Sequence, residues 1–109
     1  TFGELVDTFG FPVAQGVSWL TDSEQGLRKD RKAMACKRLS VAPCWVQTIK
    51  YADGLSNLRS IMQHDKKFAK VYVREWKDLL NVMNKGDAYL YATICREVKQ
   101  ADIILDLED

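Results

Sequence analysis

Apolar residues recur at spacings of three and four along most of this chain, which is the pattern of amphipathic helices. The pattern is clearest from about Pro43 to Gln63. The positions that form the stripe there are Cys44, Thr48, Tyr51, Leu55, Leu58 and Met62. Because Trp45, Ile49 and Ala52 widen this stripe, we expect the helix to be central and buried on two sides.

Two further helices are predicted after this segment. Asp65 is placed to cap the first of them, which ends at the sequence Asn84-Lys85-Gly86, a typical glycine stop. Its inward positions are Phe68, Tyr72, Trp76, Leu79, Leu80 and Met83. Asp87 is placed to cap the last helix. The inward positions of that helix are Leu90, Ile94, Val98, Ala101 and Leu105.

The front of the chain gives weaker signals. Thr1 can cap a short helix, and a second short helix is predicted from Phe11 to Leu20. The stretch from Glu24 to Leu39 is polar and strongly basic, which predicts a marginal helix exposed on most sides, and residues 40–43 predict a turn. Every strong signal is helical, so we expect an all-α fold of five to six helices in a single domain of residues 1–109.

The composition agrees with one globular domain and narrows the classes of function. The chain has 109 residues, with 16 Lys and Arg against 15 Asp and Glu. Its net charge of +1 gives no electrostatic attraction for nucleic acid or an anionic membrane, so we expect neither as a partner. The longest uncharged stretch, Thr8 to Thr21, is shorter than the about 20 apolar residues of a membrane span. Cys36, Cys44 and Cys95 show no paired spacing, so we expect reduced thiols used for packing and a cytoplasmic location.

A line of polar residues follows the predicted central helix. Lys50, Asp53 and Asn57 stand at spacings of three and four, so they project from one face. Asp53 lies at the edge of the apolar stripe, where we expect it to be partly buried and to need a partner. One interpretation is an ion pair with Lys50 and a hydrogen bond from Asn57. The other is a metal ion.

The same helix carries a resemblance to a known family. The segment Ile49–Arg59, which reads IKYADGLSNLR, resembles a signature of HD-domain phosphohydrolases of the RelA/SpoT hydrolase type. In those enzymes an I-K-x-A-D-x-L-x-N-x-R helix supplies the last metal ligand. Upstream, Val13–Asp22 is similar to their V-A-x-x-V-x-x-L-T-D helix, preceded here by Phe9-Gly10. Lys66–Leu80 resembles a segment of phage-borne relatives. Taken together, these segments give a similarity that covers about residues 5 to 95.

The resemblance implies roles for five residues. Asp53 matches the aspartate that closes the metal site, and Asn57 matches an asparagine near the bound nucleotide. Lys50 matches a basic position of that helix, while Arg28 and Lys32 resemble the basic segment before it. The implied chemistry uses manganese or another divalent cation to activate water for attack on phosphorus. The implied nucleotide-binding residues are Lys50, Asn57, Arg28 and Lys32, and the implied fold is the C-terminal part of an HD domain.

The chain departs from the family pattern in its metal ligands. An HD site needs a first His and a His-Asp pair before the distal Asp, and this chain begins after the region where the family carries them. We therefore expect a domain that is N-terminally truncated relative to the family. The single histidine, His64, follows the signature helix, and we expect His64-Asp65 to be a helix end with Asp65 as the next cap. One carboxylate does not hold a catalytic cation, so we assign no catalytic residue and leave enzymatic activity open.

Three hypotheses follow from this departure. The first is an HD-derived, phage-type protein, inactive on its own, that acts as an interaction or regulatory module in a homodimer or with a protein partner. The alternative is a part of a metal-dependent (p)ppGpp or nucleotide pyrophosphohydrolase whose other ligands lie outside this chain. The third is a regulator that binds a guanosine nucleotide without hydrolysing it. No cofactor is expected for this chain alone, and the basic run Arg28–Arg38 either binds phosphates or is a solvated helix face.

Overall fold

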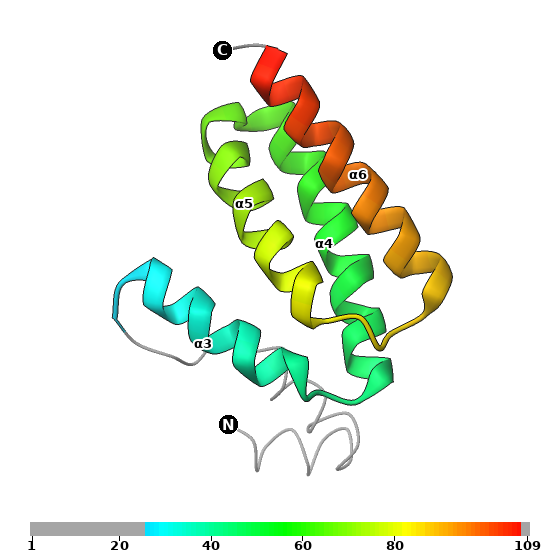
Figure 1. The fold of residues 1–109 in the computed structure, drawn as a ribbon. Coiled ribbons are helices and arrows are strands. Elements are labelled where there is room, and N and C mark those ends of the chain that lie inside the picture. Colours follow the sequence, from blue (N-terminus) through cyan, green and yellow to red (C-terminus); the bar gives the residue numbers. More distant parts are fainter. Residues whose placement is uncertain (1–25, 108–109) are drawn as a thin grey trace, which may run out of the picture.

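The computed structural model describes residues 26–107, which form four helices and no strand. They are α3 (Arg28–Ser40), α4 (Cys44–His64), α5 (Lys66–Val82) and α6 (Ala88–Leu107) (Figure 1). Among the described residues the fold is therefore all-α, as expected. The short helices predicted before residue 26 lie outside the described residues. The predicted total of five to six helices therefore stays a prediction.

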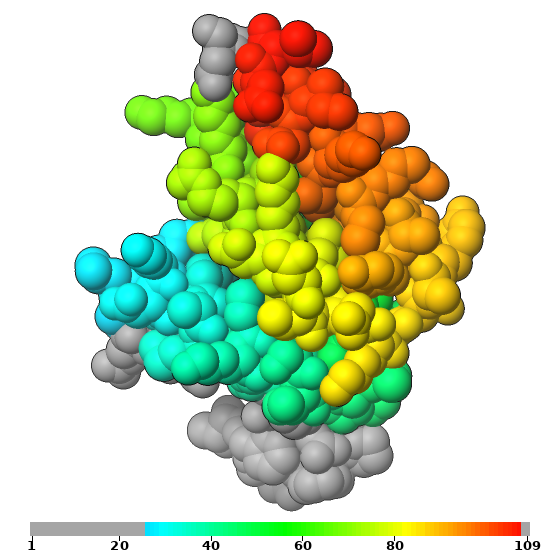
Figure 2. All heavy atoms as spheres, viewed as in Figure 1, coloured from blue at the N-terminus to red at the C-terminus, as the bar shows by residue number. Residues whose placement is uncertain are grey.

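The helices α4, α5 and α6 pack against one another, and α3 lies across one end of this group against α5 (Figures 1 and 2). Each of the four helices contributes to one continuous core. Its fully buried side chains include Tyr51 and Val46 of α4, Val73 of α5 and Ile94 of α6. Burial of these side chains supplies the main favourable free energy for the fold, because it removes their apolar surface from water.

The predicted helix ends are confirmed on both sides of α5. Asp65 accepts a hydrogen bond from the Phe68 amide at 3.1 Å and so caps α5, and Asp87 accepts one from the Leu90 amide at 2.9 Å at the start of α6. The start predicted for α3 is wrong at residues 26 and 27. Gly26 has a φ of 110°, which an α-helix does not allow, so α3 begins at Arg28.

The prediction that α4 is buried on two sides is wrong. Trp45, Ile49 and Ala52 are exposed, with 44% of Trp45 and 46% of Ile49 accessible to solvent. Tyr51, Leu55 and Leu58 of the predicted stripe are buried as expected, whereas Val46, Gln47 and Gly54 are buried without having been predicted. The inward face therefore overlaps the predicted stripe but is narrower, and it is the side through which α4 packs against α5 and α6.

Three side chains in the first half of α4 hold the neighbouring connections in place. The buried amide of Gln47 donates to Leu39 O at 3.0 Å and accepts from the Lys85 amide at 2.8 Å. The Tyr51 hydroxyl donates to Met83 O at 2.7 Å, and Thr48 Oγ1 accepts from the amide of residue 87 at 2.7 Å. These bonds satisfy backbone groups that the turns would otherwise leave unpaired, and they fix the α3–α4 turn and the α5–α6 loop to one helix.

The role predicted for the cysteines is confirmed in part. All three cysteines are free thiols. Cys36 and Cys95 contact the core, whereas Cys44 is exposed at the start of α4, so the packing role predicted for it is wrong. Among the described residues, no helix combines the length and the apolar character that a membrane span requires.

Candidate functional site

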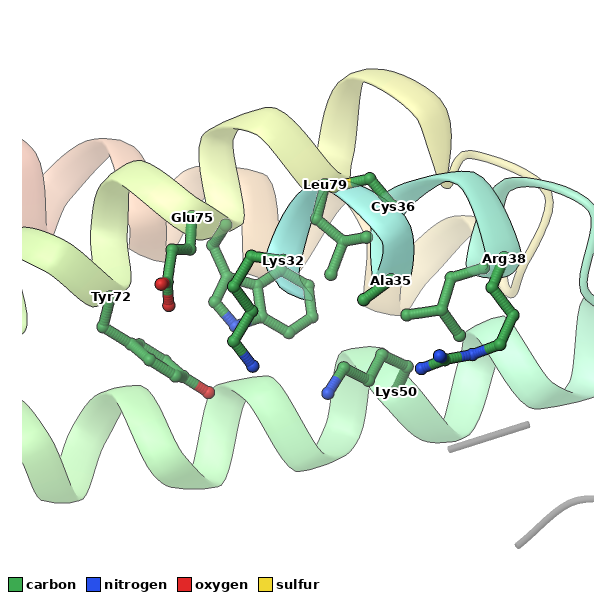
Figure 3. Close-up of a pocket in the computed structure, with 10 residues that line it drawn as sticks. Lys32, Ala35, Cys36, Arg38, Lys50, Tyr72, Glu75 and Leu79 are labelled. Atoms are coloured by element: carbon green, nitrogen blue, oxygen red, sulfur yellow. The ribbon is translucent and has the colours of Figure 1, made fainter. Parts of the chain in front are cut away.

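A pocket of about 90 Å³ lies where α3 crosses α4 and α5 (Figure 3). It is the place where the basic segment of α3 meets α4 and α5. The residues that line it are Lys32, Ala35, Cys36, Arg38, Leu39, Lys50, Tyr72, Glu75, Trp76 and Leu79. Two of the predicted nucleotide-binding residues, Lys32 and Lys50, are thus brought together although 18 positions separate them in the sequence.

Three basic side chains point into the space between α3 and α4. Lys32 and Arg38 come from α3, and Lys50 comes from α4 (Figure 3). Glu75 is the one acidic residue among the described residues that line the pocket. Opposing helices therefore deliver a local excess of positive charge in a chain whose net charge is only +1.

Aromatic side chains of α5 form the wall of the pocket. Trp76 is 3% exposed, and the Lys50 ammonium lies 5.9 Å from the centre of its ring, within reach of a cation–π interaction. Burial raises the pKa of the Tyr72 hydroxyl, although hydrogen bonding with Trp76 and Asn57 opposes the shift. Tyr72 therefore carries a neutral hydroxyl at physiological pH, which can donate a hydrogen bond to an anion.

Cys36 lines the same pocket and its chemistry is set by its surroundings. Burial raises the pKa of the Cys36 thiol, and the negative charges of Asp78 and Glu75 raise it further. Because the thiolate is the reactive form, this shift makes Cys36 a poor nucleophile at neutral pH. The pocket therefore offers side chains that can bind a ligand, whereas Cys36 is not suited to attack one as a nucleophile.

The acidic residue of the pocket is held by Arg28. The guanidinium donates two hydrogen bonds to Glu75, at 2.7 and 2.9 Å, and lies 4.9 Å from the centre of the Phe68 ring. Such a bidentate pair is the strongest kind of surface ion pair because its geometry is fixed. Arg28 does not line the pocket. Arg28, a predicted nucleotide-binding residue, thus lies beside the pocket and is bound to Glu75, which lines it.

Asp53 does not sit in the buried environment expected from the sequence. Its side chain is 55% exposed, Lys50 Nζ lies 3.9 Å from Oδ2, and Asn57 Nδ2 donates to the same oxygen at 3.3 Å. The expectation of partial burial is wrong because α4 turns Gly54, and not Asp53, toward α5. The contacts match the interpretation in which Lys50 and Asn57 serve as partners of Asp53. The part of the chain from 26 to 107 contains no group of three His, Cys, Asp or Glu side chains arranged to hold a metal ion.

His64 lies at a helix end, and Asp102 forms an ion pair between two helices. His64 is exposed and is the last residue of α4, followed by the capping Asp65, as the sequence predicted. Asp102 of α6, the first of four acidic residues between positions 102 and 109, pairs with Lys77 of α5. Glu108 and Asp109 lie outside the described residues.

The sequence did not single out Arg38, Tyr72, Glu75 or Trp76 as site residues. Arg38 was visible only as a member of the basic run, and Tyr72 and Trp76 stood at core spacing. Nothing in helical periodicity distinguishes an aromatic residue that fills a core from one that also lines a pocket. Only the crossing of α3 over α5 makes that distinction.

Comparisons of this chain with protein-family models, with curated proteins and with solved structures find no match.

Proposed function

We propose that this chain is a regulatory binding module that takes a phosphorylated nucleotide at the pocket between α3, α4 and α5 and does not hydrolyse it on its own. The observation that carries the proposal is the convergence of Lys32, Arg38 and Lys50 from two helices on one pocket. The proposal keeps two expectations from the sequence. One is that the fold resembles the C-terminal part of an HD domain, and the other is that the ligand is a guanosine nucleotide.

The chemistry of the pocket suits phosphate groups. Arg and Lys make charge-assisted hydrogen bonds to phosphate oxygens, which are shorter and stronger than neutral ones. The pocket is partly closed by α3, so these interactions are screened less by water and salt than on an open surface. The Tyr72 hydroxyl adds a neutral donor, and the Trp76 indole gives the wall an apolar surface.

The absence of hydrolysis is proposed from the surroundings of Asp53. Its carboxylate interacts with Lys50 and Asn57 on an exposed helix face, and α4 brings no further carboxylate or imidazole to it. A hydrolase would need ligands from outside the described residues. This alternative is tested by titrating manganese and measuring phosphate release from guanosine tetraphosphate. Turnover that is lost in Asp53→Ala would establish the hydrolase and overturn the binding-only proposal.

Calorimetry tests the binding proposal directly. The purified chain is titrated with guanosine tetraphosphate, GDP and guanosine, and the same titrations are repeated with Lys32→Met, Lys50→Met and Lys37→Met. Lys37 is exposed on the same helix and does not line the pocket, so it is the matched control. Loss of one charged hydrogen bond should weaken binding at least about tenfold in the first two variants and leave the third near wild type.

Two results would contradict the proposal. One is equal affinity for guanosine and its phosphorylated forms. The other is an equal loss of affinity in Lys37→Met and Lys32→Met, which would indicate a diffuse effect of charge. Thermal unfolding followed by circular dichroism shows whether each variant is folded.

A homodimer or a protein partner is the second candidate, and one observation favours it. Trp45 and Ile49 lie one turn apart on α4 and are exposed, and Val41, just before that helix, is 69% exposed. Exposed apolar side chains on one helix face are typical of interaction sites. Light scattering at increasing concentration should show dimers that Trp45→Gln and Ile49→Gln abolish. A monomer at every concentration would exclude the homodimer.

A further inference from the structure

The net charge of +1 is the sum of two parts of the chain that carry opposite charge. Residues 1–25, which lie outside the described residues, contain no lysine or arginine and four acidic residues, Glu4, Asp7, Asp22 and Glu24. All 16 Lys and Arg lie between positions 26 and 107, together with only nine Asp and Glu. The first 25 residues are therefore negative and the described residues are positive, so the two parts attract each other.

The helix that follows residues 1–25 presents a face that is both apolar and basic. Leu27, Arg31, Met34 and Arg38 follow one another at spacings of four, three and four, so they project from one side of α3. We call these four residues the α3 face. Leu27, the N-cap of the helix, is 74% exposed, and Met34 is 41% exposed. The α3 face therefore fits a partner that is itself apolar and acidic.

Arg31 gives an independent indication of a missing partner on this face. Among the described residues, its Nε atom is buried and has no hydrogen-bond partner. A buried donor without an acceptor is rare in folded proteins, because it has lost its contact with water and gained no other bond. A carboxylate placed on the α3 face would supply the acceptor, in the form of a charge-assisted hydrogen bond.

Residues 1–25 match the α3 face in composition and in reach. Besides their acidic residues they contain large apolar side chains, among them Phe9, Phe11, Val13, Val17, Trp19 and Leu20. They join α3 through Gly26, whose φ of 110° allows the backbone to change direction sharply. Twenty-five residues span up to about 80 Å when extended, whereas the 13 residues of α3 are about 20 Å long. The segment is therefore long enough to lie along the whole helix, and its covalent attachment holds it near α3 at an effective concentration on the order of millimolar.

We propose that residues 1–25 are an intrachain cover that docks on the α3 face, through apolar contact with Leu27 and Met34 and through acidic side chains that pair with Arg31 and Arg38. Arg38 also lines the pocket between α3, α4 and α5 (Figure 3). The docked cover therefore competes with an anionic ligand for Arg38 and lowers the affinity of the pocket for that ligand. The competition rests on the proposed function, whereas the docking of the cover does not.

Chymotrypsin cleavage of the full chain tests the docking. This protease cuts after aromatic residues, and Phe9, Phe11 and Trp19 give it sites in residues 1–25. Met34→Glu places a carboxylate in the apolar part of the α3 face, so these sites should be cut at least about tenfold faster than in wild type. Ala33→Glu adds the same charge at an exposed position of α3 outside this face, and its sites should be cut at the wild-type rate.

Three results would overturn the docking. One is a wild-type cleavage rate equal to that of the isolated peptide of residues 1–25, and another is equal acceleration in Met34→Glu and Ala33→Glu. The third is protection that disappears on dilution by about a hundredfold, because docking between two copies depends on concentration and docking within one chain does not. Circular dichroism shows whether Met34→Glu is folded. If it is not, Arg31→Gln should accelerate cleavage severalfold while Lys29→Gln, at an exposed position of the same helix, should not, and equal rates in these two variants would overturn the docking.

Calorimetry with guanosine tetraphosphate tests the competition. Met34→Glu and Ala33→Glu add the same negative charge to α3, so the difference between their affinities reports the cover and not the overall charge. Met34→Glu should bind the nucleotide severalfold more tightly than Ala33→Glu, because its cover no longer occupies Arg38. Equal affinities would overturn the competition. If no form of the chain binds the nucleotide, the proposed function is wrong and the competition fails with it, while the cleavage rates decide the docking separately.

Discussion

Gly54 lies in the middle of α4 at the point where Trp76 of α5 packs against the helix backbone. A β-carbon built at this position would lie 2.1 Å from Cζ2 of Trp76, and 2.6 and 2.7 Å from two further atoms of the indole. Ordinary contacts of a β-carbon begin near 3.4 Å. Trp76 is 3% exposed and cannot turn into solvent without leaving the core. Gly54→Ala should therefore destabilise the protein, although alanine is the better helix former.

The magnitude follows from two opposing effects. Replacing glycine by alanine in a helix interior stabilises by about 1 kcal/mol. Overpacking a dense core costs about 1–3 kcal/mol, and the three close contacts place Gly54→Ala at the upper end of that range. The net loss in the free energy of unfolding should be about 2 kcal/mol, which for a domain of this size lowers Tm by about 10 °C.

Urea unfolding followed by far-ultraviolet circular dichroism measures this loss. Ser56→Ala is the matched control, because Ser56 is exposed on the same helix and its change should stabilise by a few tenths of a kcal/mol. In a Trp76→Leu background, Gly54→Ala should become neutral or stabilising, since the indole is gone. A Gly54→Ala variant as stable as wild type, or an equal loss in the Trp76→Leu background, would refute the close packing of Trp76 on Gly54.

The remaining predictions concern the Tyr51 hydroxyl, the Arg59–Glu97 ion pair and Asp53. Tyr51→Phe removes a buried hydroxyl that donates to a carbonyl and accepts from an amide of the α5–α6 loop. Urea unfolding should therefore show a loss of about 1–3 kcal/mol in the free energy of unfolding. Tyr89→Phe, at a position that is 76% exposed, should show no loss. The Arg59 guanidinium lowers the pKa of Glu97, so this pair stabilises the fold above the ordinary carboxyl pKa of 4.5 and the stabilisation is lost as the pH falls through the lowered value. The urea midpoint of Glu97→Gln should therefore lie below that of wild type at pH 7 and approach it toward pH 3, and a constant difference would contradict the linkage. Asp53→Ala should change the free energy of unfolding by less than about 1 kcal/mol, because its ion pair is exposed, and a larger loss would contradict that exposure.

The order of the helices from residue 28 onward and the caps of α5 and α6 were predictable from the sequence, whereas the start of α3 was not. Asp65 and Asp87 supply caps through their own side chains, and capping depends only on residues one turn away. The inward positions of α6 were largely predictable, since Ile94, Val98, Ala101 and Leu105 are buried as expected. Those of α5 were predictable in part: Trp76, Leu79, Leu80 and Met83 are buried as expected, whereas Ala69 and Val73 are buried without having been predicted.

The inward face of α4 was predictable only in part, through Tyr51, Leu55 and Leu58, because apolar residues surround much of that helix. Trp45 and Ile49 are as apolar as Val46 and Leu55, and spacing alone does not rank them. Glycine carries no hydrophobic signal, so the sequence gave no weight to the position where the largest side chain of the core is seated. The choice was made by the fit between Trp76 and Gly54, which is a property of two helices together.

The sequence by itself determined that this protein is helical, where its later helices are capped, and that basic residues gather between positions 28 and 38. These features depend on neighbours within about one turn, and local physical chemistry is sufficient to specify them. Only the tertiary structure decided that Lys32 and Lys50 share a pocket, that Arg28 binds its carboxylate wall, and that Asp53 lies on the exposed side of α4. Those outcomes depend on how α3 crosses α5 and how α4 is rotated, and both are set by the packing of side chains that are distant in the sequence.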